Sequence, residues 1–330
     1  MSENEVFNMY FGIIEDHRCE VNVVHPLVDI LKLVMIAILC GMDELDKIID
    51  YGENKKEFLK KEFNIKLIPS KSTLTRVIAT INPKWLSLSI VCILNTLIKN
   101  NPSQIMLDGK AIKSTDAIKT IETMMNIVTA YTDTGISLGQ ITVDSKSNEI
   151  PAVRELIKML NIEGMVITAD AMHCQKETAE TIIKNKGDYV LQLKANQGNF
   201  YKDVYAMFDD KYMNEADKDC EYETFSTTEI SCYLSSKNTT AENLLSYTRK
   251  HWEIESMHHI LDVTYDEDRC KLLTQRAQEN LNIFRKTGIS IHKNYLKEKK
   301  QTVKSNMFNC LLNDNLLLEV IGNITNCNNR

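Results

Sequence analysis

The sequence has few of the residues that mark several common protein classes. Its 330 residues include only 5 prolines and 11 glycines, which argues against long linkers. Its 9 cysteines form no Cys-x-x-Cys pair, so neither a zinc site nor a disulfide framework is indicated. The acidic start, Met-Ser-Glu-Asn-Glu, is unlike a targeting peptide, and the apolar run over residues 30–40 is too short to span a bilayer. We therefore expect a cytoplasmic protein that does not enter a membrane.

An excess of positive charge is also missing. Lys and Arg number 39 against 45 Asp and Glu, giving a net charge of −6, whereas a simple nucleic-acid binder is usually basic. This balance does not exclude a DNA-processing enzyme, because metal-binding carboxylates add negative charge and a basic surface can be local. Basic residues do cluster at Lys55-Lys56, at Lys60-Lys61 and between Lys293 and Lys304.

The first hundred residues show the apolar spacing of helices. The pattern predicts helices over residues 27–39, 43–51 and 55–63, a further helix capped by Ser72, and a last one over residues 85–98 after the break at Asn82-Pro83. We expect a packed helical domain over residues 1–100.

The pattern changes at about residue 104. It predicts strands over residues 104–110, 125–131 and 136–143, a helix over 150–160, a strand over 165–170, a helix over 174–186 and a strand over 188–194. Three hairpin-linked strands followed by helix-linked strands are what an RNase H-like sheet would show. The expected fold class is therefore α/β: an RNase H-like catalytic core, with a mixed sheet flanked by helices, plus an N-terminal helical domain and a C-terminal helical segment.

Two of the predicted buried strands end in aspartate, at Asp108 and Asp170. Ligands bind at strand ends in α/β sheets, so the two carboxylates would face each other if their strands are neighbours. Carboxylates that close repel unless a cation compensates, and Mg²⁺ prefers such oxygen ligands. Two such ions could support an in-line displacement at phosphorus.

A third carboxylate is expected from a helix that contains Glu255. Arg249, His251 and Trp252 lie within two turns on its N-terminal side and would supply cations for phosphate and an aromatic ring for a base. Glu253 is the local alternative, but two helical positions apart the two glutamates point to different faces.

Three further residues are candidate DNA contacts near this pocket. Lys110 could touch a phosphate, or it could be a solvated lysine. Lys194 and Asn196 could position substrate, or they could simply end a strand.

Ordered motifs along the chain resemble one known family. They are Phe11–Arg18, Leu27–Gly41, Pro69–Arg76, Asp108-Gly-Lys110, Val143–Ile150, Thr168–Gln175, Gly187–Gln197 and His251–Glu255 followed by Leu261-Asp-Val263. Together they resemble the IS4-like DDE transposases, and most closely the ISAs1 group with the H-repeat-associated proteins.

This resemblance implies a role for each matched residue. Asp108, Asp170 and Glu255 would form the catalytic metal-binding triad, with Mg²⁺ or Mn²⁺ as cofactor. The reaction would be DNA cleavage and strand transfer on double-stranded DNA, at transposon ends and target, by a homo-oligomer in the bacterial cytoplasm, associated with the nucleoid when bound to DNA. It also implies a transposase-associated helical domain over residues 1–100 and a catalytic domain over residues 101–330.

The spacing of the motifs departs from the family at one place. Asp170 and Glu255 are only 85 positions apart, whereas family members usually carry a β-rich insertion there. We expect an internal deletion near 229–230, which leaves a truncated insertion around 208–236. Three hypotheses remain open: a transposase, a metal-dependent nuclease of the same fold, and a catalytically inactive DNA-binding or regulatory remnant.

Overall fold

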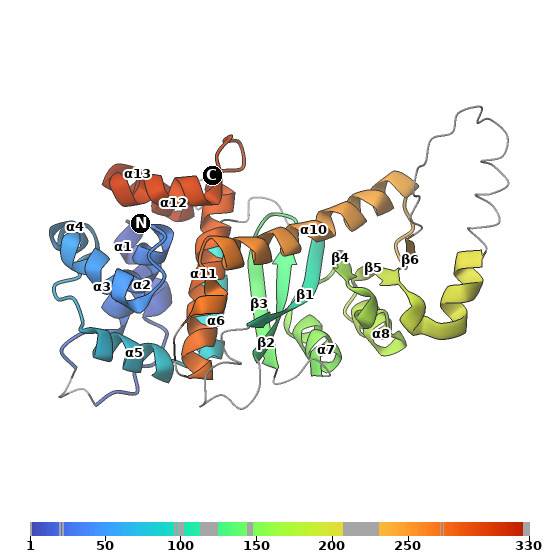
Figure 1. The fold of residues 1–330 in the computed structure, drawn as a ribbon, viewed down its shortest axis with the longest axis horizontal. Coiled ribbons are helices and arrows are strands. Elements are labelled where there is room, and N and C mark those ends of the chain that lie inside the picture. The colour runs from blue at the N-terminus through green and yellow to red at the C-terminus, as the bar shows by residue number, and fades with distance from the viewer. Residues whose placement is uncertain are drawn as a thin grey trace.

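A computed structural model describes residues 2–19, 21, 23–95, 97, 102–112, 125–143, 148–206, 231–270, 272 and 274–325. A helical body and a six-stranded sheet lie side by side along the longest axis of the molecule (Figure 1). The strands are β1 (Gln104–Ile112), β2 (Met125–Thr132), β3 (Ser137–Val143), β4 (Val166–Ala169), β5 (Asp188–Leu193) and β6 (Cys232–Ser235).

The helical body contains the first six helices of the chain. They are α1 (Glu3–Phe11), α2 (Leu27–Leu39), α3 (Leu45–Asn54), α4 (Lys56–Phe63), α5 (Lys71–Thr80) and α6 (Pro83–Asn95). The prediction that Ser72 caps the fourth of the expected helices is wrong. The hydroxyl of Ser70 accepts the Thr73 N–H at 3.3 Å, so α5 begins two residues earlier. Among the described residues no single helix is long and apolar enough to cross a bilayer, and the one pair that reaches that length together, α5 with α6, is bent by 91°.

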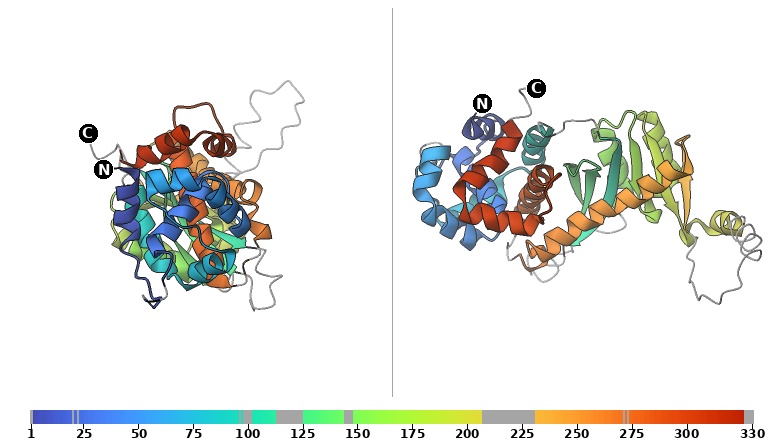
Figure 2. Two further views of the ribbon diagram at one scale, coloured as in Figure 1. Left: turned by 90° about the vertical axis from the view of Figure 1, so that its left-hand side faces the viewer. Right: turned by 90° about the horizontal axis from the view of Figure 1, so that it is seen from above.

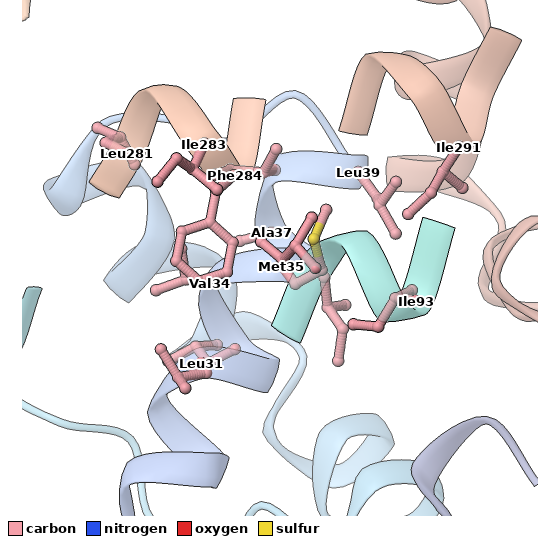
Figure 3. Close-up of a cluster of buried hydrophobic side chains, with 14 of the residues drawn as sticks. Leu31, Val34, Met35, Ala37, Leu39, Ile93, Leu281, Ile283, Phe284 and Ile291 are labelled. Atoms are coloured by element: carbon pink, nitrogen blue, oxygen red, sulfur yellow. The ribbon is translucent and has the colours of Figure 1, made fainter. Parts of the chain in front are cut away.

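Helices from the far end of the chain complete this body. They are α11 (Gln275–Tyr295), α12 (Val303–Leu312) and α13 (Asp314–Thr325). Most side chains of α2 and α11 are buried, and Figure 3 shows Leu31 and Val34 of α2 packed near Phe284 of α11, with Ile93 of α6 close by. One hydrophobic core therefore joins the N-terminal and C-terminal helices. The division into domains at residue 100 stays a prediction.

The sheet has the order β3-β2-β1-β4-β5-β6. Strands β1 to β3 are antiparallel neighbours, while β4 pairs parallel to β1 and β5 parallel to β4. This arrangement confirms the predicted RNase H-like core. Strand β6, which the sequence did not predict, closes the sheet by pairing antiparallel with β5. Residues 207–230, including the predicted deletion point and most of the truncated insertion, lie outside the described residues.

Helices cover both faces of the sheet. Because side chains alternate along a strand, Ile105 and Leu107 pack into the cluster made with α7 (Glu149–Met159) and α8 (Lys176–Lys184). Met106 points the other way, toward the core shared with α10 (Ala241–Val263) and α11. Helix α10 runs diagonally across this second face (Figure 2). Asp108 has the same parity as Met106, so it belongs to the face that α10 covers.

Candidate active site

The register of two parallel strands brings Asp108 and Asp170 to the same level. Leu107 of β1 pairs with Ala169 of β4, and each aspartate is the next residue in the chain. The two strands are therefore neighbours, which is the condition under which the two carboxylates were expected to face each other. The prediction that Asp108 ends its strand is wrong, because β1 continues to Ile112 by pairing with β2. Asp108 therefore lies within a strand, and only Asp170 follows the end of one.

A histidine on α10 contacts each aspartate. His258 Nδ1 lies 3.2 Å from Asp108 Oδ2, and His251 Nε2 lies 3.6 Å from Asp170 Oδ1. Thr168 Oγ1 is 2.9 Å from His251 Nδ1 and so orients that ring. The contact with His251 is the main reason that the pKa of Asp170 lies below its ordinary value, although partial burial acts in the opposite direction.

Glu255 lies on the same side of α10 as these two histidines. It is four residues after His251 and three before His258, spacings that share one helix face, and its side chain is exposed. Glu253 points elsewhere. Burial raises its pKa, and the charges around it are Lys293, Lys250 and Asp133 rather than the two aspartates.

A further histidine lies deep in the same region. His173 follows β4 in η4 (Ala171–His173), is completely buried, and has no hydrogen-bond partner for either ring nitrogen. Burial lowers its pKa, while the charges of Asp170 and Asp108 favour the protonated ring. His258 Nε2 is likewise buried without a partner. The region thus holds buried histidine nitrogen atoms that have no hydrogen-bond partner.

The side-chain oxygen atoms of this region are suitable ligands for a hard cation. Asp108, Asp170 and Glu255 offer the carboxylate oxygens that Mg²⁺ and Mn²⁺ prefer. Within the described part of the chain, however, no group of three His, Cys, Asp or Glu side chains is close enough to hold an ion as the side chains stand. The two aspartates are instead paired with histidines.

The Asp108-Gly-Lys110 motif contacts three different elements. Asp108 meets α10, as described above. A Cβ atom on Gly109 would lie 2.7 Å from Glu149 Oε2 at the start of α7, so any larger residue there would force the end of the Glu149 side chain to move. Lys110 Nζ lies 2.7 Å from Asp262 Oδ1 and 3.0 Å from Glu267 Oε2.

These ion pairs correct the expectation that Lys110 contacts DNA. Its side chain is only 9% exposed and two carboxylates already neutralise it, so it has little charge to offer a phosphate. The alternative of a solvated lysine is wrong for the same reason.

The other candidate DNA contacts described here lie on the solvent-exposed side of the site. Lys194 is exposed, and its charge contributes to the lowered pKa of Asp170. Asn196 Nδ2 donates to the Ala171 carbonyl at 2.9 Å and so holds its loop against η4. Arg249 is exposed, and Trp252 is 67% exposed on the outer face of α10.

Sequence reasoning missed the contact between His258 and Asp108. The available signal was the spacing of His251 and His258, seven residues apart and therefore on one helix face. It did not reveal which strand residue each histidine meets, because that depends on how α10 crosses the sheet.

Comparison with known proteins identifies the family. The sequence matches the family described as "Transposase DDE domain" over residues 88–289 and the family described as "DDE_Tnp_1-associated" over residues 9–91. The chain belongs to the DDE transposase family. The predicted DDE transposase ancestry is thereby confirmed, while membership of the ISAs1 group stays a prediction.

Similar proteins are known from Escherichia coli. YhhI of strain K12, an H repeat-associated protein named as a candidate transposase, is 30% identical over 86% of this chain and 89% of its own length. YncI of strain O157:H7, also named as a candidate transposase, is 28% identical over 368 aligned positions, which include 94% of this chain and 93% of YncI. A solved piggyBac transposase synaptic complex with hairpin DNA shows 14% identity and a TM-score of 0.48 over 98% of this chain and 81% of that chain, a similarity too distant to add to the assignment.

Proposed function

We propose that this DNA transposase cuts and joins DNA at transposon ends, with Asp108, Asp170 and Glu255 as its metal-binding residues. The observation that carries the proposal is the level pairing of the two aspartates in β1 and β4, with Glu255 on α10 between the two histidines that contact them. Two other carboxylates of α10 have different surroundings, since Asp262 pairs with Lys110 and Glu253 lies among lysines.

A divalent ion, Mg²⁺ or Mn²⁺, would be held by these three carboxylates. When bound, it would activate a water or 3′-hydroxyl and stabilise the leaving oxygen in an in-line displacement. The chain's own residues prepare the place. His258 contacts Asp108, His251 contacts Asp170, and Thr168 orients the ring of His251.

Exposed residues beside the triad suit double-stranded DNA, at transposon ends and target. Arg249 and Lys194 offer cations for phosphates, and Trp252 offers a ring on which a base can stack. We further propose that the protein belongs to the ISAs1 group, works as a homo-oligomer on DNA and resides in the bacterial cytoplasm, associated with the nucleoid when bound to DNA.

The proposed deletion is supported by one alignment. The 368 positions aligned with YncI exceed the 330 residues of this chain, so part of that relative has no counterpart here. The motif spacing puts the missing part near 229–230. A shortened path could displace Glu255, and a catalytic group moved by about 1 Å can lose on the order of a hundredfold in rate.

Contacts along α10 argue that this displacement has not occurred. Gln104 Nε2 donates to the Tyr247 carbonyl at 2.8 Å, near the start of the helix. Further along, His251 meets Thr168 and His258 meets Asp108. None of these contacts involves the segment in which the deletion is proposed, so α10 is held on the sheet by its own residues.

One observation favours a second candidate, a catalytically inactive remnant that binds transposon ends. Among the residues that the structure describes, no three potential ligands stand close enough to hold an ion. If the side chains cannot rearrange, the protein would bind DNA without cutting it.

A strand-transfer assay tests these candidates. Labelled duplex DNA that carries the terminal repeats flanking the gene is incubated with the full chain and Mg²⁺ or Mn²⁺, beside an Asp108→Ala control. We expect joined products from the wild-type chain and none from the control. Products that are cut but never joined would indicate a nuclease, and retarded but intact DNA would indicate the remnant.

A further inference from the structure

Lys110 lies at the centre of a buried charge network. Its ammonium group bridges Asp262 near the end of α10 and Glu267 in η6 (Glu267–Arg269), at 2.7 and 3.0 Å. Glu267 is completely buried, and burial and the opposing carboxylates act against each other on the pKa of Lys110, which is raised. A lysine so enclosed serves the protein interior rather than a ligand.

Glu267 connects Lys110 to the helical body. Its Oε1 accepts a hydrogen bond from Asn282 Nδ2 at 2.7 Å and lies 3.5 Å from Arg285 NH1. Arg285 is also buried, and its NH2 lies 3.0 Å from Asp43 Oδ2 in the segment between α2 and α3. Nearby positive charges, first Arg285 and then Lys110, hold the pKa of Glu267 below its ordinary value despite burial. The network thus runs from the helical body to β1.

Two parallel contacts join β1 to α10. Asp108 meets His258, and Lys110 meets Asp262. Two residues along a strand span about 6.8 Å, and four residues along a helix span about 6 Å, so both contacts can form at once. Because the pairs lie side by side, they fix the helix both along its axis and about it. A shift of one turn, about 5.4 Å, would break both pairs.

We propose that Lys110 is a positioning residue that locks α10 against β1 and thereby presents Glu255 to the two aspartates. This inference rests on the proposed function of that site. Glu255 lies only one helical turn before His258, between the locked end of α10 and His251. Lys110 itself touches neither metal nor DNA.

Metal binding measured without DNA tests the inference. Mn²⁺ is titrated into the full-length protein and the free ion is followed by electron paramagnetic resonance. Lys110→Met should weaken Mn²⁺ binding about tenfold or more, the range seen when residues that orient metal ligands are removed. Asp262→Asn should weaken it similarly. The side chain of Asp262 is 41% exposed, so this second variant removes the lock with less disturbance of the core.

A matched control separates positioning from general stability. Lys55 Nζ lies 2.7 Å from Asp314 Oδ1, an ion pair of the same length that joins the residue between α3 and α4 to the start of α13. Lys55→Met should leave Mn²⁺ binding unchanged. The double variant Lys110→Met with Asp262→Asn should bind no more weakly than Lys110→Met alone, because both substitutions remove the contact between Lys110 and Asp262.

The outcomes also separate this inference from the proposed function. If Lys110→Met and Asp262→Asn bind Mn²⁺ as tightly as the wild-type chain, the lock is refuted, even if the wild-type chain joins DNA. Additive losses in the double variant also refute it. If the variants weaken Mn²⁺ binding but the wild-type chain never joins DNA, the lock stands and strand transfer fails. A wild-type chain that binds no Mn²⁺ overturns both.

Discussion

The two halves of α10 lie in opposite environments. Its C-terminal half meets Asp108 and Lys110, whose side chains are 18% and 9% exposed, beside the fully buried Glu267. Its N-terminal half meets Asp170, whose side chain is 53% exposed, and carries Trp252 on the outside. One helix is thus anchored by enclosed charges at one end and open at the other. We propose that DNA approaches the open end and that the anchored end keeps α10 in place over the site.

The largest effect on the rate of strand transfer is expected when either aspartate loses its charge. Asp108→Asn and Asp170→Asn should each lower the rate of strand transfer by about a thousandfold or more, as when a member of a catalytic group is lost. The rate is measured with pre-cut labelled ends. Asp46→Asn, on an exposed ion pair of α3, is the control and should retain the wild-type rate. Wild-type activity in Asp170→Asn would show that the open end takes no part in the chemistry.

Substitutions at the anchored C-terminal end of α10 should instead lower the free energy of unfolding. Glu267→Gln leaves Lys110 and Arg285 buried without their shared carboxylate and should lower the free energy of unfolding by about 3–5 kcal/mol. Urea unfolding followed by circular dichroism measures it. In the exposed pair of Glu163 with Lys186, Glu163→Gln should cost at most about 1 kcal/mol. Equal costs for the two variants would show that the network anchors nothing.

A smaller effect is expected where β1 passes α7. Gly109→Ala would put a Cβ atom 2.7 Å from Glu149 Oε2, and we expect a loss of about 1–3 kcal/mol in the free energy of unfolding. Gly139→Ala on β3 is the matched control, because its Cβ would lie at an ordinary 3.6 Å from Leu156 Cδ1. If both alanines cost the same, the close approach of Glu149 does not constrain the strand.

The last expected effect is a change in the pH dependence of stability at the anchored end. Burial lowers the pKa of Lys286 to about 7, below its value in an unfolded chain. Between pH 7 and the unfolded pKa, the unfolded state therefore binds more protons, so stability should rise with pH by at most about 1.4 kcal/mol per unit. Lys286→Met should flatten the curve of unfolding free energy against pH. An unchanged slope would mean that Lys286 keeps an ordinary pKa.

Local patterns in the sequence predicted the elements but not their contacts. The strands around Asp108 and Asp170 followed from apolar runs, but the sequence left open whether they are neighbours, and their parallel pairing is seen only in the structure. The ion pairs of Lys110 could not be predicted from the sequence. They depend on Asp262 and Glu267, which come close to Lys110 only because of the way α10 crosses the sheet. Strand β6 was missed because four residues are too few to show a clear alternation of apolar and polar residues, and they form a strand by pairing with β5.

The third carboxylate decides whether this transposase still works. Glu255→Gln and Glu253→Gln alter neighbouring glutamates of the same helix, so the pair is its own control. We predict that strand transfer into labelled DNA falls about a thousandfold or more in Glu255→Gln and stays near the wild-type rate in Glu253→Gln. Equal activity of the two variants, or a loss confined to Glu253→Gln, would contradict the account.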